Sequence, residues 1–282
     1  MDYYFSDIKE SLLTVVTDIL GHNEYLLKGG QAMREHMRIV GDDILARFSR
    51  DIDISLPYES FPLPLSDFSE LLKRKYNEIS EVQLGIKAIS VSKIPQNEDA
   101  YFGLRIGLNF GKKNQKGHIG NKIYFKDIES LAVVIDFTCK EVVADSFINL
   151  EDLDIHIAKA ELIIAEKFRA LCSNEFDPKN NILPRPKDFY DIFILYVGKY
   201  NRDPDSDTLN CINDYIVKCF EIKDMPLELL KNLDNGSQRD FHRRNFQEQV
   251  IDTLDRKNRY IDITFDQVYS ETLEFLDKIL NA

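Results

Sequence analysis

The chain has 282 residues, of which 44% are hydrophobic and 30% are charged. This length and this balance are typical of a globular protein with one large domain or two ordinary ones, and they exclude a disordered or collagen-like chain. The net charge is −12. Such an acidic chain is a poor candidate for a broad nucleic-acid surface, because proteins held to nucleic acid by their general field are usually basic.

Targeting signals and paired cysteines are missing from the sequence. No apolar run approaches the roughly 20 residues that cross a bilayer, and the first ten residues lack the basic and apolar regions of a secretory signal. The four cysteines are widely spaced and form no CxxC pair. We therefore expect a soluble cytoplasmic protein without membrane contact, structural zinc or disulfides.

Helical and strand patterns alternate in the first half of the chain. Apolar residues recur at helical spacing over 5–20 and over 66–79, where Ser66 is a candidate N-cap, and a further helix is expected over 31–38. Segments rich in β-branched, aromatic and alternating apolar residues predict strands over 25–28, 51–56, 82–94, 101–110 and 131–138. Residues 111–121 are expected to be a loop.

From about residue 152 the pattern is helical throughout. Helices are predicted over 155–173, 187–199, 206–220, 238–255 and 265–280. The predicted fold class is therefore α/β (α+β), with a domain at 1–150 and an all-helical domain at 151–282.

Two aspartates on one predicted strand are the first candidate residues for a functional site. Side chains alternate along a strand, so Ser49, Asp51 and Asp53 share one face while Ile52 and Ile54 point into the core. Carboxylates this close repel one another unless a cation sits between them, and oxygen ligands suit Mg²⁺. The alternative is a solvated edge strand with two exposed aspartates.

Two other segments could belong to the same site. Gly29 and Gly30 end a strand and precede a helix, which lets backbone N–H groups approach a phosphate. Asp136 interrupts an apolar strand, where a carboxylate is costly unless it is paired or metal-bound. Beside Asp51 and Asp53, it would complete a cage of three carboxylates for two metals.

These segments, in this order, carry a resemblance to a known family. GGQAM at 29–33 and RFSRDIDISL at 47–56, followed by EKFRAL at 166–171 and RPKDFYDI at 185–192, resemble the AbiEii group of nucleotidyltransferase toxins. The resemblance covers about 25–200 and departs from the usual pattern at Gln31, where Thr or Ser often follows the glycines. It implies a nucleotidyltransferase-type mixed sheet with flanking helices at 1–150 and a helical domain at 151–282 that completes the active site.

The helical half contributes one lysine and two aspartates to the expected site. Lys167 lies on a buried-facing stripe with Ile164 and Leu171, where a lysine either snorkels to solvent or meets an anion. By resemblance, Lys167 holds triphosphate. Asp188 and Asp191 are three apart and hence neighbours on one helix face. By resemblance they position Lys167 or the acceptor, Asp188 directly and Asp191 by orienting it.

The resemblance implies transfer of a nucleoside monophosphate from an NTP to an acceptor hydroxyl. It implies Mg²⁺, with Mn²⁺ as the alternative, as cofactor, together with an RNA (tRNA) acceptor and a cognate antitoxin. Expected metal ligands are Asp51, Asp53 and Asp136, and expected triphosphate contacts are Gly29, Gly30, Ser49 and Lys167. Arg47 is expected to be either a phosphate contact or a structural partner.

Other interpretations remain open at this point. A small-molecule acceptor is the rival enzyme, and a nucleotide-binding module without turnover is the rival of another class. Residues 100–126 hold six basic side chains and no acidic one, so this stretch either touches a polyanionic acceptor or is a solvated hairpin tip. The five histidines show no metal-ligand spacing and are expected to be surface or satisfied core residues.

Overall fold

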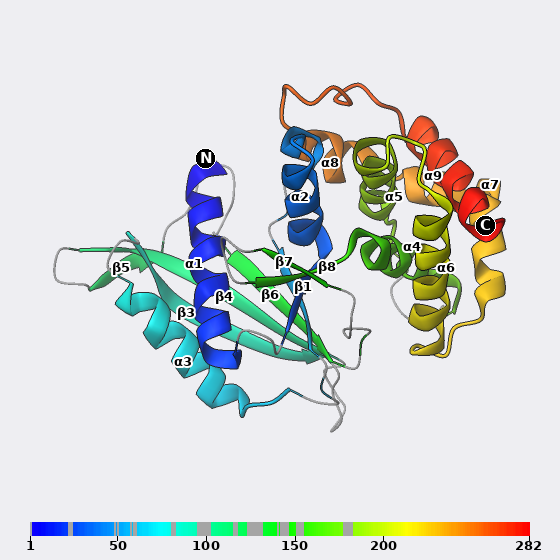
Figure 1. The fold of residues 1–282 in the computed structure, drawn as a ribbon. Coiled ribbons are helices and arrows are strands. Elements are labelled where there is room, and N and C mark those ends of the chain that lie inside the picture. Colours follow the sequence, from blue (N-terminus) through cyan, green and yellow to red (C-terminus); the bar gives the residue numbers. More distant parts are fainter. Residues whose placement is uncertain are drawn as a thin grey trace. The chain divides into compact units, whose positions relative to one another are not determined.

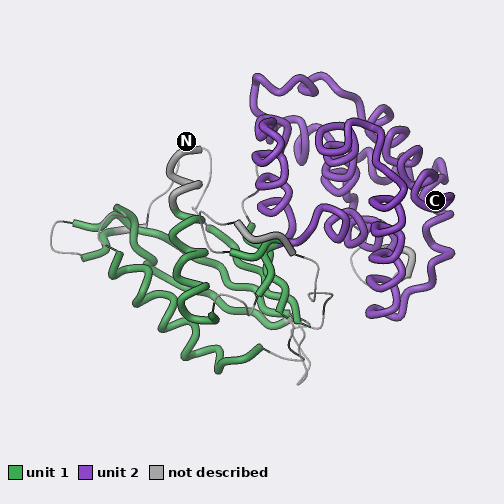
Figure 2. The backbone as a smooth tube through the Cα atoms, in the orientation of Figure 1, with its two compact units in different colours: residues 1–27, 50–157 green, residues 28–49, 158–282 purple. Residues whose placement is uncertain are grey.

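The computed structural model describes residues 2–21, 25–47, 49, 51–56, 58, 61–79, 83–94, 103–114, 118–122, 132–139, 141, 147–150, 155–176 and 183–282. Figure 2 shows its two compact units. Unit 1 consists of residues 1–27 and 50–157, and unit 2 of residues 28–49 and 158–282. Residues 28–49, which include Gly29 and Gly30, therefore pack with the C-terminal helices, although we expected residues 1–150 to form one domain.

Unit 1 is built on a mixed sheet (Figure 1). In the described residues it has eight strands, in the order β3-β4-β6-β2-β1-β8-β7, with β5 paired to β4. β2 and β6 are parallel, as are β1 and β8, whereas β4 runs antiparallel to β3, β5 and β6. Their bounds are β1 Leu26–Lys28, β2 Asp51–Leu56, β3 Leu84–Ile94, β4 Gly103–Lys113, β5 Ile119–Lys122, β6 Ala132–Cys139, β7 Phe147–Leu150 and β8 Ile155–Ala158.

Helices α1 (Asp2–Leu20) and α3 (Leu65–Glu78) cover one face of this sheet (Figure 1). The rings of Phe61, Phe68 on α3 and Phe137 on β6 meet edge to face, with centroids 5.1–5.4 Å apart. Large apolar side chains that point toward α3 are thereby removed from water, which is the main source of stability for such a layer. Polar residues that alternate with them on the same strands point to the other face.

Unit 2 is helical in its described residues, as the pattern of the second half predicted. Its long elements are α2 Gly29–Ile39, α4 Ala160–Phe176, α5 Pro186–Ile194, α6 Ser206–Glu221 and α9 Phe265–Leu280; the short α7 Gly236–Arg243 and α8 Phe246–Gln249 lie between α6 and α9. Tyr196, on the π-helical continuation of α5, stacks on Phe275 of α9 with ring centroids 4.4 Å apart. In the part of the chain that the structure describes, no helix combines the length and apolar character required to cross a bilayer.

Two predicted segments contain strands that the periodicity did not reveal. Residues 155–158 form β8 rather than the start of a helix, since Ile155 and Ile157 are buried on alternate positions and α4 begins only at Ala160. The loop expected at 111–121 is too long as well, because β4 continues to Lys113 and β5 begins at Ile119; residues 115–117 lie outside the described residues. Short apolar runs fit the period of a helix as well as that of a strand, and pairing with a neighbouring strand then decides which of the two forms.

Two helix boundaries also differ from the prediction. Ser66 is not an N-cap: α3 follows Pro64, and the Ser66 hydroxyl bonds Asp67 inside the helix. The single helix expected at 238–255 is broken at Asn245, whose φ of 63° is left-handed. Asparagine adopts this conformation more readily than most residues, so α7 and α8 are separate helices.

Candidate functional site

The paired aspartates lie on a central strand of unit 1. Ile52 and Ile54 are fully buried, whereas Asp51 is exposed and Asp53 is partly exposed, which is the alternation expected of β2. β2 runs between β6 and β1. The solvated edge strand considered from the sequence is therefore wrong, and the two carboxylates occupy the face opposite α3.

Asp136 lies on the same face as these two aspartates. β2 and β6 are parallel, and Asp53 and Asp136 are register partners. Side chains in register on neighbouring strands point to the same side of a sheet. On β6, Ile135 and Phe137 are buried on the other face. The structure thus places Asp136 on the same face of the sheet as the two aspartates of β2.

A fourth charged residue, Arg105, joins this carboxylate face, defined here as Asp51, Asp53 and Asp136. In the antiparallel pair of β4 and β6, Arg105 is the register partner of Asp136. Its Nε and Nη2 donate to the two oxygens of Asp136 at 2.8 and 2.7 Å. The hydrogen bond to Asp136 raises the pKa of Arg105, and the charges of Asp51 and Asp53 add to the effect. The sequence showed Arg105 only as part of a basic stretch.

The carboxylate face fits a divalent cation in its chemistry. Its donors are oxygens, which Mg²⁺ and Mn²⁺ prefer, and the guanidinium of Arg105 already lies against one of the three carboxylates. Both oxygens of Asp136 are engaged by that guanidinium. Among the described side chains, no three acidic, histidine or cysteine residues form a group that could hold a metal ion. The metal ligands named from the sequence therefore stay a prediction.

The glycine pair begins a helix in unit 2. Gly29 has a φ of +64° and is the first residue of α2, so the glycines belong to the helix instead of preceding it. Gly30 packs against Ser49: a Cβ at Gly30 would lie 2.8 Å from the Ser49 Cβ and 3.5 Å from Nη2 of Arg47. The start of α2 has no acidic residue and no side-chain cap. Its N–H groups are suited to an anion.

Gly30→Ala is expected to lower the free energy of unfolding by about 1–3 kcal/mol, because the added methyl group would overlap Ser49. Urea unfolding measures this loss. Gly236→Ala is the matched control: its Cβ would meet nothing within 4 Å at the start of α7, so it should be neutral or stabilise by up to about 1 kcal/mol. Equal effects of both substitutions would contradict the close approach.

Alternating charges form an ion-pair ladder in unit 2, defined as Arg47, Asp191, Lys167, Asp188 and Arg185. It is buried at Arg47, Asp191 and Lys167 and reaches solvent at Arg185. The guanidinium of Arg47 donates twice to Asp191, at 2.9 Å each. The ammonium of Lys167 lies 2.7 Å from Asp191 and 3.0 Å from Asp188. At the other end of the ladder, Nη1 of Arg185 donates to Oδ2 of Asp188 at 3.1 Å. Three cations and two carboxylates leave one net positive charge.

Electrostatics keep Lys167 and Asp188 charged at neutral pH. Burial alone would lower the pKa of Lys167, but the carboxylates of Asp191 and Asp188 raise that pKa above its ordinary value. Burial alone would raise the pKa of Asp188, but the cations of Lys167 and Arg185 hold it well below its usual range. Lys167 therefore does not snorkel to solvent. It is a buried cation whose position two helices fix.

His242 is a buried residue next to this ladder that the sequence did not single out. Its Nδ1 accepts a hydrogen bond of 3.0 Å from the backbone N–H of Arg185, and its Nε2 has no hydrogen-bond partner. The ring is fully buried against Phe189 and Phe241. Burial lowers the pKa of His242 to about 4 despite the nearby carboxylate of Asp188.

The lowered pKa of His242 predicts a loss of stability in mild acid. Below pH 6.5 the imidazole of His242 is protonated in the unfolded chain, whereas in the folded protein it is protonated only near pH 4. The free energy of unfolding should therefore fall between these pH values by up to about 3 kcal/mol. Thermal melts from pH 7.5 to 4 measure it. His242→Asn keeps an acceptor for Arg185 and should flatten the pH dependence, leaving the part due to His36, whose pKa burial also lowers.

The exposed His118 provides the control for this pH series. His118→Asn should leave the wild-type pH dependence unchanged, because the His118 side chain is exposed and is not packed in the folded core. A pH dependence of His242→Asn as steep as that of the wild type would contradict the assignment.

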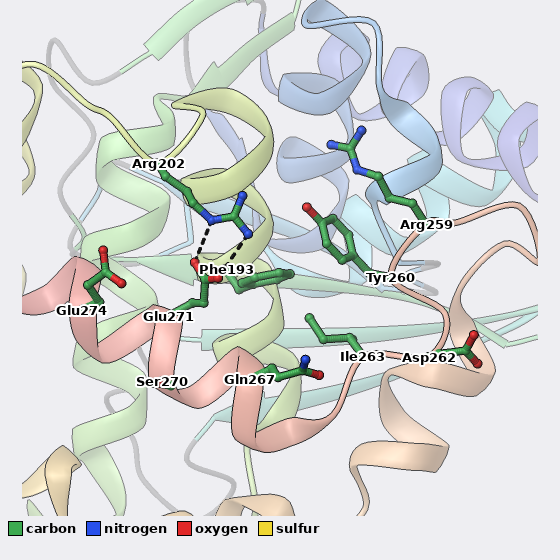
Figure 3. A pocket seen from close by; sticks show the side chains of 10 residues that line it. All are labelled: Phe193, Arg202, Arg259, Tyr260, Asp262, Ile263, Gln267, Ser270, Glu271 and Glu274. Atoms are coloured by element: carbon green, nitrogen blue, oxygen red, sulfur yellow. Dashed lines mark hydrogen bonds and ion pairs between the residues drawn. The ribbon is translucent and has the colours of Figure 1, made fainter.

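A separate pocket of about 520 Å³ lies within unit 2. Figure 3 shows Arg202 bound by two hydrogen bonds to Glu271 on its wall, with the rings of Phe193 and Tyr260 nearby. None of the residues predicted to bind nucleotide or metal lines it. The pocket is therefore distinct from both the carboxylate face and the ion-pair ladder.

Fold and residues together define a class of protein. A mixed sheet with paired aspartates on a central strand, a third on the neighbouring strand and a glycine-led helix is consistent with a nucleotidyltransferase-type fold. The family model described as "Nucleotidyl transferase AbiEii toxin, Type IV TA system" matches residues 12–271. The chain belongs to this family. The match includes every predicted site residue, and the comparison with curated proteins gave no match.

Proposed function

We propose that this protein transfers a nucleoside monophosphate from an NTP to an acceptor hydroxyl and releases pyrophosphate. The observation that carries the proposal is the register pairing of Asp53 with Asp136 on the face that also bears Asp51, in a chain of the AbiEii family. A chain that only binds nucleotide has no need for three carboxylates on one exposed face, where their repulsion is costly.

In unit 1, Asp51, Asp53 and Asp136 would hold Mg²⁺ or Mn²⁺, which when bound stabilises the attacking and leaving oxygens of an in-line displacement. Asp136 also serves to accept the proton of the acceptor hydroxyl. A carboxylate within hydrogen-bond reach of that hydroxyl is a suitable general base.

In unit 2, Lys167 neutralises the charge that develops on the leaving pyrophosphate, because it remains a cation although it is buried. The side chain of Asp188 is 15% exposed and that of Asp191 is fully buried. These exposures support a direct role for Asp188 and an orienting role for Asp191. Arg47 is buried in its double hydrogen bond with Asp191, which supports a structural role over a phosphate contact.

The start of α2 is the proposed triphosphate contact of unit 2. Gly29 and Gly30 carry no side chains that would shield the backbone N–H groups, and Ser49 lies directly against the buried Gly30. Phosphate groups bind such helix starts through N–H groups and the helix dipole.

RNA, and in particular tRNA, is the proposed acceptor. Membership of a toxin family supports a target whose modification stops growth, and an RNA target would place the protein in the cytoplasm. The stretch 100–126 supports a local contact with phosphates through Lys112, which is exposed. Arg105 contributes less to such a contact, because it is paired with Asp136. An antitoxin encoded with the toxin is the expected partner.

Incubation with each labelled NTP, Mg²⁺ and total tRNA, followed by gel separation of the RNA, tests the proposal. Label on RNA is the expected result. Label only on small molecules would replace the RNA acceptor by a small one, and tight NTP binding without any product would favour a binding module. Expression in growing cells tests toxicity. The wild-type protein should arrest growth, and Asp51→Asn should relieve the arrest.

A further inference from the structure

Arg105, Asp136 and Asp53 form a row across three neighbouring strands. Arg105 is in register with Asp136 between β4 and β6, and Asp136 is in register with Asp53 between β6 and β2. The guanidinium of Arg105 takes both oxygens of Asp136 at 2.8 and 2.7 Å. A positive side chain thus neutralises part of a face that otherwise carries three carboxylates.

This pairing restricts what else Asp136 can bind. An arginine–carboxylate pair with two parallel hydrogen bonds uses both oxygens and fixes their orientation. A divalent cation needs lone pairs of at least one of those oxygens. The guanidinium of Arg105 and a divalent cation therefore compete for the carboxylate of Asp136, and their positive charges repel each other across the same small face.

The exposure of the two partners decides which of them moves. The side chain of Arg105 is 56% exposed, and that of Asp136 only 18%. A guanidinium that leaves Asp136 enters water at little cost, whereas Asp136 is held on β6 among buried neighbours. Release of Arg105 requires a side-chain rotation and no change in the sheet.

We propose that Arg105 is the built-in counter-cation of the carboxylate face, and that a divalent cation binds Asp136 only by displacing it. The inference rests on the proposed function, because it takes this face to be the cation site. Without a divalent cation, Arg105 offsets the repulsion among the carboxylates. When the cation arrives, the freed guanidinium projects from β4 as an anion-binding group.

Binding of Mn²⁺ alone, without nucleotide, tests the proposal on the full chain by electron paramagnetic resonance of the free ion. Arg105→Gln is expected to bind Mn²⁺ about tenfold more tightly than the wild type, since the competitor is gone. Arg105→Lys, which keeps the charge but loses the double hydrogen bond, should fall between them. Lys73→Gln removes an exposed cation from α3, on the opposite face of the sheet, and should change the affinity less than about twofold.

A double-mutant cycle separates competition from general charge repulsion. The gain from Arg105→Gln should vanish in Arg105→Gln/Asp136→Asn, where the contested carboxylate is absent. Equal or weaker Mn²⁺ binding by Arg105→Gln overturns the proposal, and so does a gain that survives in the double variant. Without metal, Arg105→Gln should also melt at a lower temperature than the wild type. Added Mn²⁺ should remove this difference in melting temperature.

The transfer assay keeps this inference distinct from the proposed function. Wild-type transfer of label to RNA, together with no gain in Mn²⁺ affinity for Arg105→Gln, removes the inference alone. A clear gain in affinity, together with no transfer under any condition, removes the proposed function and leaves Arg105 as the competitor of a cation site.

Discussion

Asp51→Asn and Asp53→Asn should each reduce nucleotidyl transfer by at least about 10³-fold, equivalent to roughly 4 kcal/mol of transition-state free energy. Each amide keeps the size of the carboxylate but removes the charge that would hold a metal ion. Both side chains face away from the core while Ile52 and Ile54 are buried, so the fold should survive. Initial rates with labelled NTP measure the loss.

Asp67→Asn is the matched control for these two variants. Asp67 is an exposed aspartate near the start of α3, on the helix that covers the opposite face of the sheet. Its replacement should leave the transfer rate within about twofold and the melting temperature nearly unchanged. Wild-type rates for Asp53→Asn at saturating Mg²⁺ would refute the role of the carboxylate face.

Asp191→Ala should cause the largest loss of stability, about 3–5 kcal/mol. Asp191 is fully buried and accepts hydrogen bonds from both Arg47 and Lys167. Its removal would leave two cations in a poorly solvated interior with one carboxylate fewer. Asp191→Asn should cost less, because an amide oxygen still accepts one of these hydrogen bonds. Urea unfolding followed by circular dichroism measures both losses.

Asp214→Ala provides the reference for this experiment. Asp214 is an exposed residue of α6, and its replacement should change the free energy of unfolding by less than about 0.5 kcal/mol. A loss below about 1 kcal/mol for Asp191→Ala would show that the ladder is far better solvated than its burial indicates.

Local patterns predicted the parts of the site that depend on one element. Alternation along β2 was enough to place Asp51 and Asp53 on one face, and helical spacing was enough to make Asp188 and Asp191 neighbours, where both now bind Lys167. These predictions needed only the periods of a strand and a helix.

Long-range partners could not be predicted in this way. Arg47 and Asp191 are 144 residues apart, and Arg105 meets Asp136 only because β4 pairs antiparallel with β6. Strand order and register depend on packing between distant segments, which periodicity does not encode. For the same reason, the packing of residues 28–49 with the C-terminal helices was not foreseen.

Transfer with the radiolabel in either the α- or the γ-phosphate of the NTP tests the central claim most directly. A nucleotidyltransferase moves the α-phosphate with the nucleoside, so α-label should appear on the acceptor and γ-label should leave with pyrophosphate. Asp53→Asn should transfer neither. Label on the acceptor from the γ-phosphate, or from neither NTP with the wild-type protein, would contradict the account.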